Sequence, residues 1–477
     1  MPRPLPVRGV VEGFYGPPWT PDARLGLIEF IAERAMNAYV YAPKSDPKHR
    51  DRWREPYDEH EAGHFHRLAE RAASGGVRFG FAISPGLDID YTHAGDRDTL
   101  LTKLVPLLDV GVDWFVLALD DIPPRPGLAV DQAGLASWLL DALRSRAVGA
   151  RLTLVPTEYV GVRPTPYLRE LAERLPAEIE DVMWTGATVC SPTIDAGQAR
   201  SWADALGGRH PLLWDNYPVN DGTMERALHL GPYRGRPPEL SDELAGVLCN
   251  PMLQPYASRV ALATAADYLA DPARYDPAES WARAITEVGG THAAPLGALA
   301  AACEDGPLHA PEELQAHRIV TAIAAGTDGG DDAALAAARD HFTAVKQAAK
   351  AWADAPDDPL GCELEPWLRQ GRAEAAAALA AVGLLEHLAS AEPETDASLL
   401  HVFAVVFAWN AARAGDRTVF GPRFAVYPAV VQLADGSAGL DVGLAVSENR
   451  NAVDRLCRLA LDAYRRRTER PRAGGLR

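Results

Sequence analysis

The sequence predicts an α/β protein, a (β/α)8 TIM barrel followed by a C-terminal helical-bundle domain, and three observations support this prediction. First, residues 7–270 alternate between short β-branched or aromatic runs and longer amphipathic segments. Second, the short runs are almost continuously apolar, which is typical of parallel strands covered on both faces. Third, about eight such units over ~250 residues indicate a closed barrel rather than an open sheet. We therefore expect a catalytic barrel over residues 5–285 and a mainly helical domain over residues 290–477.

The predicted strands are separated by segments whose apolar residues recur at helical spacing, as in Leu25–Ile31 and Tyr167–Leu175. The stretch Gly222–Ser241 contains Gly, Pro and His and is predicted to be a long loop before the last strand. The eight predicted strands are Arg8–Gly13, Ala38–Ala42, Arg78–Ser84, Trp114–Leu119, Arg151–Thr157, Asp181–Thr185, Leu212–Asn216 and Leu244–Asn250.

The C-terminal part has a different composition, because Ala-rich, helix-prone segments replace the strand signal. Asp332–Trp352 and Gly371–Leu388 are predicted helices, the tail Arg423–Gln432 could include a strand, and a helix is expected over Arg450–Arg465. These C-terminal helices are also the candidate interface for a homodimer.

Charge limits the classes of partner. The formal net charge is −18, from 47 Lys and Arg against 65 Asp and Glu, and a surface this acidic repels polyanions. Nucleic acid and anionic membranes are therefore not expected partners. The one basic candidate is the Arg-rich end after Arg465, which is expected to be a solvated terminus.

The cysteines give no sign of a metal site or a disulfide framework, since the chain has five and none forms a CxxC pair. No cofactor is indicated. The start of the chain lacks the apolar stretch of a signal peptide, and no later run looks apolar enough to span a bilayer. We therefore expect a cytoplasmic protein.

The ends of the predicted strands carry the candidate site, because working residues of a parallel barrel lie at the carboxyl ends of its strands. These positions combine Trp, Tyr and Phe with Asp, Asn and one Lys, a mixture that suits a neutral, polyhydroxylated ligand. Phosphate-binding fingerprints are missing. The histidines His49, His60, His64, His66 and His93 fall in predicted helices or loops and are expected to be solvated.

The sharpest feature is Asp120-Asp121 at the end of the fourth strand. Repulsion between neighbouring carboxylates should raise the pKa of at least one, which would give the protonated and ionised pair that glycoside hydrolysis uses. Helix capping, a turn or metal binding would also explain such a dipeptide. Ordinary glycosidases hold two carboxyls on opposite sides of the scissile bond, which adjacent residues do not readily do. Substrate assistance removes this conflict, because the 2-acetamido oxygen of the substrate is then the nucleophile.

The motifs at five strand ends resemble those of glycoside hydrolase family 84, which includes protein O-GlcNAcases and bacterial β-N-acetylglucosaminidases. The matches keep their order and cover the predicted barrel. They are Gly9–Trp19, Tyr41–Lys44, Leu119–Ile122, Trp214–Asn216 with Asn220-Asp221, and Asn250–Met252.

This resemblance implies a β-N-acetylglucosaminidase that acts on a GlcNAc-containing glycoside or glycoconjugate without a metal or other cofactor. It implies that Asp120 orients and polarises the acetamido group, and that Asp121 is the general acid and then the base. No role carries over to Glu12 or Glu158, which are expected to be structural. For binding, the resemblance implies Tyr159 and Asn250 around the acetamido group, Lys44, Asn216, Asp221 and the backbone of Gly13 at ring hydroxyls, and Trp214, Thr185 and Val189 as walls around the acetyl group.

Two alternatives stay open at the level of sequence. One is a non-catalytic GlcNAc-binding barrel protein, which would be expected to have lost one carboxylate. The other is a hydrolase of the hexosaminidase or chitinase type, which usually carries Asp-x-Glu or Asp-Glu at this strand end.

Overall fold

The structure is a computed structural model whose described residues fall into two compact units. The first unit comprises Met1–Glu225 and Pro232–Ala284, and the second comprises Arg226–Gly231 and Ile285–Arg477. The described residues are 4–179, 181–326, 332–352, 355–390, 396–422, 429–432, 438–441 and 451–468.

The first unit is a closed barrel of eight parallel strands in the order β1 to β8, with β8 pairing back onto β1. All eight predicted strands are confirmed, and every observed end lies within two residues of its expected position. The strands are largely buried on both faces, which explains their near-continuous apolar sequence. They are β1 Val7–Glu12, β2 Ala38–Tyr41, β3 Arg78–Ile83, β4 Trp114–Ala118, β5 Arg151–Val155, β6 Val182–Trp184, β7 Pro211–Asp215 and β8 Gly246–Cys249.

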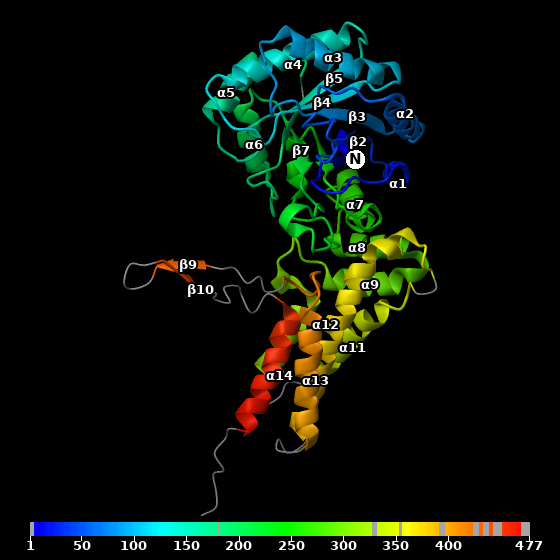
Figure 1. Cartoon of the computed structure of the whole chain (residues 1–477), viewed down its shortest axis with the longest axis vertical. Coiled ribbons are helices and arrows are strands. Elements are labelled where there is room, and N and C mark those ends of the chain that lie inside the picture. The colour runs from blue at the N-terminus through cyan, green and yellow to red at the C-terminus, as the bar shows by residue number, and fades with distance from the viewer. Residues whose placement is uncertain are drawn as a thin grey trace, which may run out of the picture. The chain divides into compact units, whose positions relative to one another are not determined.

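Helices cover the outside of the barrel and follow the strands in alternation (Figure 1). Their ends are encoded locally: Thr20 caps α1 by accepting a hydrogen bond from the Ala23 N–H, with Pro21 at the first helical position. Asp58 and Glu61 form a reciprocal capping box on α2. The helices are α1 Pro21–Glu33, α2 Glu59–Ser74, α3 Ala94–Asp109, α4 Leu128–Arg144, α5 Pro166–Arg174, α6 Ala196–Ala205 and α7 Pro255–Ala270.

The inside of the barrel is a packed core and not a pore. Its side chains come from all eight strands or from the residues directly after them, as is usual for this fold. One member, Trp214, also lines a pocket at the strand ends, so the core supports part of the wall of that pocket.

The connection from β7 to β8 is long and mostly irregular, as predicted for Gly222–Ser241. It contains two short 3-10 helices, η1 Gly222–Met224 and η2 Pro238–Glu243. Within this connection, Arg226–Gly231 belong to the second unit.

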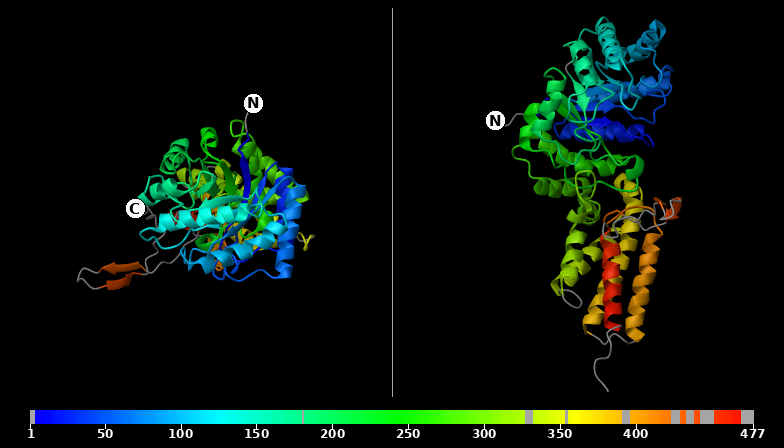
Figure 2. Two further views of the ribbon diagram at one scale, coloured as in Figure 1. Left: turned by 90° about the horizontal axis from the view of Figure 1, so that it is seen from above. Right: turned by 90° about the vertical axis from the view of Figure 1, so that its left-hand side faces the viewer.

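The second unit is mainly helical. Its long helices α11 to α14 run alongside one another, as the yellow to red ribbons in Figure 2 show, and α12 packs against α11, α13 and α14. The elements are α8 Pro277–Gly289, which spans the unit boundary, η3 Gly290–His292, α9 Ala293–Ala302, η4 Pro311–Glu313, α10 Gln315–Ala325, α11 Asp332–Ala348, α12 Pro359–Ser390, α13 Asp396–Arg413, α14 Ala452–Thr468, and the antiparallel strands β9 Ala429–Gln432 and β10 Ala438–Asp441.

The sequence predictions for this unit were correct in type but incomplete. The predicted strand in the tail is β9, and the predicted last helix is α14. Helix α12 begins at Pro359 rather than Gly371, and α13 was not predicted at all. Of the Arg-rich end, Arg465 to Arg467 lie in α14, while the residues from 469 onward fall outside the described part of the chain.

One expectation about membranes needs correction. Among the described residues, α12 is long and apolar enough to cross a bilayer, with a mean hydropathy of 1.2 over an 18-residue window. Half of that window is buried inside the protein, and the core helix of a globular domain meets the same criteria.

Candidate active site

A pocket opens at the carboxyl ends of the barrel strands, and all eleven site residues expected from the sequence line it. Its empty space is about 600 Å³, including the part open to solvent, within the range of small-molecule sites. The pocket is lined by Gly13, Tyr15, Lys44, Asp120, Asp121, Val155, Tyr159, Met183, Trp184, Thr185, Val189, Cys190, Trp214, Asn216, Val219, Asp221 and Asn250.

Asp120 lies at the buried end of an ion pair. The Lys44 Nζ donates to its Oδ2 at 2.6 Å, and both side chains are at least nine-tenths buried. The other carboxylate oxygen, Oδ1, is buried and has no hydrogen-bond partner in the protein. A buried acceptor without a donor is costly, by about 1–3 kcal/mol, so this atom is a ready position for an N–H group of a ligand.

Asp121 has a different set of partners. The Tyr15 hydroxyl donates to its Oδ2 at 2.7 Å, and the Tyr159 hydroxyl donates to its Oδ1 at 2.8 Å. Its backbone has a φ of +56°, in the left-handed region that side chains other than glycine seldom adopt. Although they are adjacent in sequence, the two carboxylates therefore engage separate groups: Asp120 a buried ammonium, and Asp121 the hydroxyls of the exposed Tyr15 and the half-buried Tyr159.

The electrostatics of Asp120 contradict a sequence expectation. Burial by itself would raise the pKa of this carboxyl, but the Lys44 ammonium, with a smaller contribution from Arg50, more than compensates, so its pKa lies below the usual value. The prediction that repulsion within the pair would raise a pKa is therefore wrong for Asp120. Lys44 lies 76 residues away in sequence, so no local sequence pattern indicates this pair.

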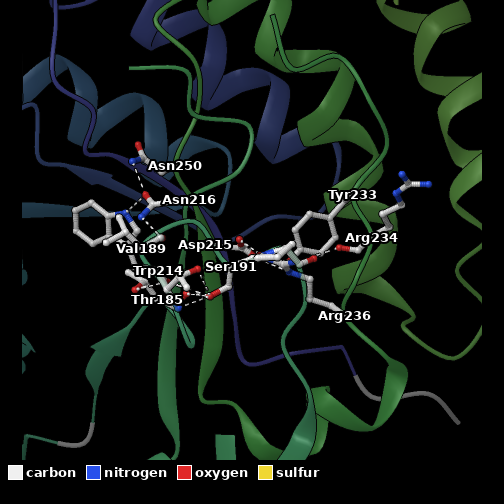
Figure 3. Close-up of polar contacts among 12 residues, drawn as sticks. Thr185, Val189, Ser191, Trp214, Asp215, Asn216, Tyr233, Arg234, Arg236 and Asn250 are labelled. Carbon is white, nitrogen blue, oxygen red and sulfur yellow. Dashed lines mark hydrogen bonds and ion pairs between the residues drawn. The ribbon is translucent and has the colours of Figure 1, made fainter. Parts of the chain in front are cut away.

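A chain of hydrogen bonds links pocket residues at the ends of β7, β8 and β1, and Figure 3 shows its members Trp214, Asn216 and Asn250. The Asn216 Oδ1 accepts from the Trp214 indole N–H and from the Asn250 amide, each at 2.9 Å. The Asn250 Oδ1 in turn accepts from the Gly13 N–H at 3.2 Å. A Cβ at Gly13 would lie 2.1 Å from the Trp214 ring, so only glycine allows this close approach.

Asp221 is a half-buried carboxylate that lines the pocket. Its Oδ2 accepts a hydrogen bond from the Tyr15 N–H at 2.7 Å. Burial raises its pKa, and the nearby Asp121 carboxylate adds to this effect. The loop after β1 thus holds the side chain in the pocket lining, where it can accept hydrogen bonds from hydroxyl groups.

Sequence reasoning missed one prominent residue, Tyr15, although the motif that contains it was recognised. Its hydroxyl and its backbone N–H contact Asp121 and Asp221, respectively. Burial, followed by the hydrogen bond to Asp121, raises the pKa of Tyr15, so the hydroxyl stays protonated and is a donor at neutral pH. Its place directly after the first strand was the signal that could have identified it.

Two further expectations concern residues near the pocket. Glu12 was expected to be structural, and it is fully buried and bonded to Arg24, outside the pocket lining. His49 was expected to be solvated, and this is wrong. It is completely buried, its Nδ1 lies 2.9 Å from the Ala82 carbonyl oxygen, and burial lowers its pKa to about 4. Within the described part of the chain, no group of three or more His, Cys, Asp or Glu side chains is arranged to hold a metal ion.

Comparison with known proteins, by sequence and by structure, gives relatives that are named as N-acetylglucosaminidases or O-GlcNAc hydrolases. The family described as beta-N-acetylglucosaminidase matches residues 8–301. Protein O-GlcNAcase of Rattus norvegicus is 38% identical over 273 residues, which are 54% of this chain and 29% of the relative. A mutant of the Thermobaculum terrenum O-GlcNAc hydrolase superposes with a TM-score of 0.80 at 32% identity, covering 87% of this chain and 92% of that one. The structure named CpGH84B gives a TM-score of 0.80 at 30% identity, covering 87% and 75%. The matched region therefore spans less than a third of the curated relative.

Proposed function

The chain belongs to the β-N-acetylglucosaminidase family, glycoside hydrolase family 84, and on that premise we propose that it is a retaining exo-β-N-acetylglucosaminidase. The nucleophile in this proposal is the 2-acetamido oxygen of the substrate. The main support for this proposal is that the two adjacent carboxylates have different partners. Asp120 is paired with Lys44 and has one oxygen without a partner, whereas Asp121 accepts hydrogen bonds from two tyrosine hydroxyls.

In the first step the acetamido oxygen attacks C1, and the bond from C1 to the leaving oxygen breaks. Asp120 accepts a hydrogen bond from the acetamido N–H at its Oδ1, which increases the electron density on the acetamido oxygen. Its low pKa suits this role, because the carboxylate must be ionised to accept. Asp121 gives a proton to the leaving oxygen as general acid.

The first step forms a cyclic oxazoline intermediate, and in the second step Asp121, now ionised, takes a proton from water as that water attacks C1. The bond between C1 and the acetamido oxygen breaks, which restores the acetamido group. The two displacements at C1 retain the β configuration. No second carboxylate is needed on the opposite face of the sugar, which is why neighbouring residues suffice here although most glycosidases separate their carboxyls.

The other pocket residues fit the binding of one terminal sugar. In this proposal Lys44, Asn216, Asp221 and the backbone of Gly13 bind ring hydroxyls, and Tyr159 and Asn250 contact the acetamido group and intermediate. Thr185, Val189 and Trp214 form the walls around the acetyl group. All of these residues line the pocket.

A panel of aryl β-GlcNAc, β-GalNAc and β-glucoside substrates, together with an O-GlcNAc peptide, tests the reaction. Release from the β-GlcNAc substrates but not from the β-glucoside is expected, since the glucoside has no acetamido group. A thiazoline mimic of the oxazoline should inhibit competitively. An inactive protein that still binds GlcNAc would favour the alternative of a non-catalytic binding barrel.

Exo action is supported by the carboxylate of Asp221 in the pocket lining, which could bind hydroxyls of a terminal sugar, and the net charge of −18 opposes a polyanionic chain. We therefore propose a terminal, uncharged β-GlcNAc of a glycoside or glycoconjugate as the substrate, with little action on hyaluronan. Incubation with hyaluronan should leave the viscosity unchanged. A rapid fall with oligosaccharide products would mean an open cleft and a wrong assignment for Asp221.

A cytoplasmic setting is part of the proposal, supported by five cysteines that are all unpaired in the structure. Cell fractionation with a periplasmic or secreted control protein tests it.

A homodimer through the C-terminal helices is also proposed, supported by an apolar stripe on α13. Leu400, Phe403 and Phe407 are 69%, 67% and 80% exposed and lie at helical spacing. Light scattering coupled to size-exclusion chromatography should give twice the chain mass for the wild type and the monomer mass for Phe403→Glu. A monomeric wild type at micromolar concentration would contradict the dimer.

A further inference from the structure

Asp215 and Arg236 form an ion pair directly behind the wall of the pocket, and neither residue has a role in the proposed reaction. Asp215 is the last residue of β7 and stands between Trp214 and Asn216, which both line the pocket. Since successive side chains of a strand point to opposite sides, the Asp215 carboxylate points away from the pocket. There it meets Arg236, with side-chain exposures of 3% and 1% (Figure 3).

The Arg236 guanidinium has an acceptor for each of its five N–H groups. It donates to the two Asp215 oxygens at 2.8 and 2.7 Å, and Tyr233 donates a further hydrogen bond to the same carboxylate. The remaining donors go to the backbone oxygens of Ser191, Pro192 and Arg234, at 2.9, 3.0 and 3.1 Å. A planar fork of five donors is a property of arginine alone, so lysine cannot make this set of contacts.

The Ser191 and Pro192 carbonyls belong to the loop after β6, which supplies one side of the pocket through Thr185, Val189 and Cys190. Ser191 also closes this loop on itself. Its hydroxyl accepts from the Thr188 N–H at 3.0 Å and donates to the Thr185 carbonyl at 3.1 Å.

The loop has no spare room where these contacts are made. Gly186 has a φ of +97°, and a Cβ there would lie 2.3 Å from the Ser191 hydroxyl oxygen. Gly235 has a φ of +77°, and a Cβ there would lie 2.3 Å from the Pro192 carbonyl oxygen. On the pocket side, the Asn216 amide donates to the Val189 carbonyl at 2.7 Å. The loop is therefore tied to β7 from both faces of the strand.

We propose that Arg236 is a positioning residue that sets the width of the acyl pocket, and thereby the length of the N-acyl group that the enzyme accepts. Arg236 touches no substrate. It holds the loop that carries Thr185 and Val189 at a fixed distance from Trp214, through Asp215 on one side and the Ser191 and Pro192 carbonyls on the other. This inference rests on the proposed function, because it assigns the space between these residues to the acetyl group.

The test compares aryl β-glucosaminides that carry N-acetyl, N-propionyl and N-butyryl groups. The ratio of kcat/KM for two of these substrates does not depend on how much of the protein is folded, because the concentration of active enzyme cancels. In Arg236→Lys, the loop should lose its fixed position, so kcat/KM for the N-acetyl substrate falls while the longer substrates lose less. We expect the preference for N-acetyl over N-butyryl to drop by about tenfold, the effect of roughly one methylene group in a fitted pocket.

Ser191→Ala is the milder second variant, because it removes one hydroxyl and leaves the ion pair intact. It should reduce the same preference to a smaller extent. Arg24→Lys is the matched control, since Arg24 forms an equally buried bidentate pair with Glu12 outside the pocket lining. This control should become less stable without any change in the N-acyl preference.

An unchanged preference in both Arg236→Lys and Ser191→Ala, with an active wild type, overturns the positioning role. An equal change in Arg24→Lys would also overturn it, because the effect would then be one of general stability. A wild type that hydrolyses none of the N-acyl substrates overturns the proposed function instead, so the two failures are distinguishable.

Discussion

Two buried ion pairs at the barrel strand ends, Glu12–Arg24 and Asp120–Lys44, have similar chemistry but different degrees of completion. The Glu12 carboxylate has no exposure and accepts from the Arg24 Nε at 3.1 and 2.9 Å and from its Nη2 at 2.7 Å, and the Tyr39 hydroxyl donates to it as well. The Asp120 carboxylate receives Lys44 on one oxygen and nothing on the other. We call Glu12–Arg24 the closed pair, because donors within the protein reach both oxygens of its carboxylate. We call Asp120–Lys44 the open pair, because one oxygen of its carboxylate remains available as an acceptor.

This difference separates a structural use of charge from a chemical one. Burying two charges stabilises a fold only when geometry and further hydrogen bonds offset the desolvation cost. Around Glu12 the protein supplies those bonds itself. Around Asp120 it leaves one bond to be made, in a pocket, and a ligand donor would recover the cost of the unsatisfied oxygen.

The largest effect on activity is expected at Asp121, the exposed carboxylate next to Asp120. Asp121→Asn should lower kcat about 10²- to 10⁴-fold on substrates with poor leaving groups, because a general acid is then missing. On an activated aryl glycoside, the first step should be nearly unaffected. Steady-state and burst kinetics on both substrate types measure this, and equal losses on the two would contradict the role.

Asp120→Asn should lower turnover even with an activated leaving group, since cyclisation of the acetamido group precedes any use of the acid. A loss of about 10²-fold or more is expected on a nitrophenyl substrate. Glu12→Gln is the control from the closed pair and should change kcat per folded enzyme far less. Turnover at the wild-type rate by Asp120→Asn would remove this residue from the mechanism.

The comparison also shows what could be predicted from sequence. The bounds of the eight strands were correct within two residues, because buried parallel strands are almost wholly apolar. In a parallel barrel the carboxyl ends of all strands lie at the same end of the barrel. The eleven expected residues meet in one pocket for that reason. The helical unit was less predictable, because an Ala-rich pattern gives helices without fixing their ends, as the start of α12 shows.

The sequence could not predict which charged side chains pair with one another at the carboxyl ends of the barrel strands. Lys44 meets Asp120 over 76 residues, and Arg236 meets Asp215 over 21, and neither separation leaves a local signal. The direction of the Asp120 pKa followed from such a pairing, so an argument from adjacent charges failed. The left-handed backbone of Asp121 was likewise invisible, since nothing but its tertiary setting holds it there.

The closed pair should matter more for the stability of the fold, and the open pair should matter more for activity. Glu12→Gln leaves Arg24 buried without its counter-charge, and about 3–5 kcal/mol of unfolding free energy should be lost. Asp120→Asn also leaves Lys44 without its counter-charge, but it should cost less, because it removes a buried carboxylate oxygen that has no donor in the protein. Urea denaturation of the two variants, followed by tryptophan fluorescence, checks the ranking. A larger loss for Asp120→Asn would mean that the open pair is also the main structural one.

The smallest effect is expected in the pH dependence, and Lys44→Met is the variant that reveals it. Burial raises the pKa of Asp120, whereas Lys44, Arg50 and a backbone hydrogen bond together lower it, so removal of the Lys44 ammonium should raise this pKa. In the wild type the depressed pKa means that the ionised form stabilises the fold above about pH 3.9, the ordinary value for Asp. That stabilisation is lost as the pH falls through the lower folded value. In Lys44→Met the acid limb of kcat on an activated aryl glycoside should therefore move to higher pH. Lys48→Met is the control, because Lys48 pairs with Glu61, which lies outside the pocket lining, and its removal should leave the limb in place. An acid limb that stays at the wild-type position in Lys44→Met would show that Asp120 is ionised without Lys44, and the contrast between the open and the closed pair would then lose its electrostatic basis.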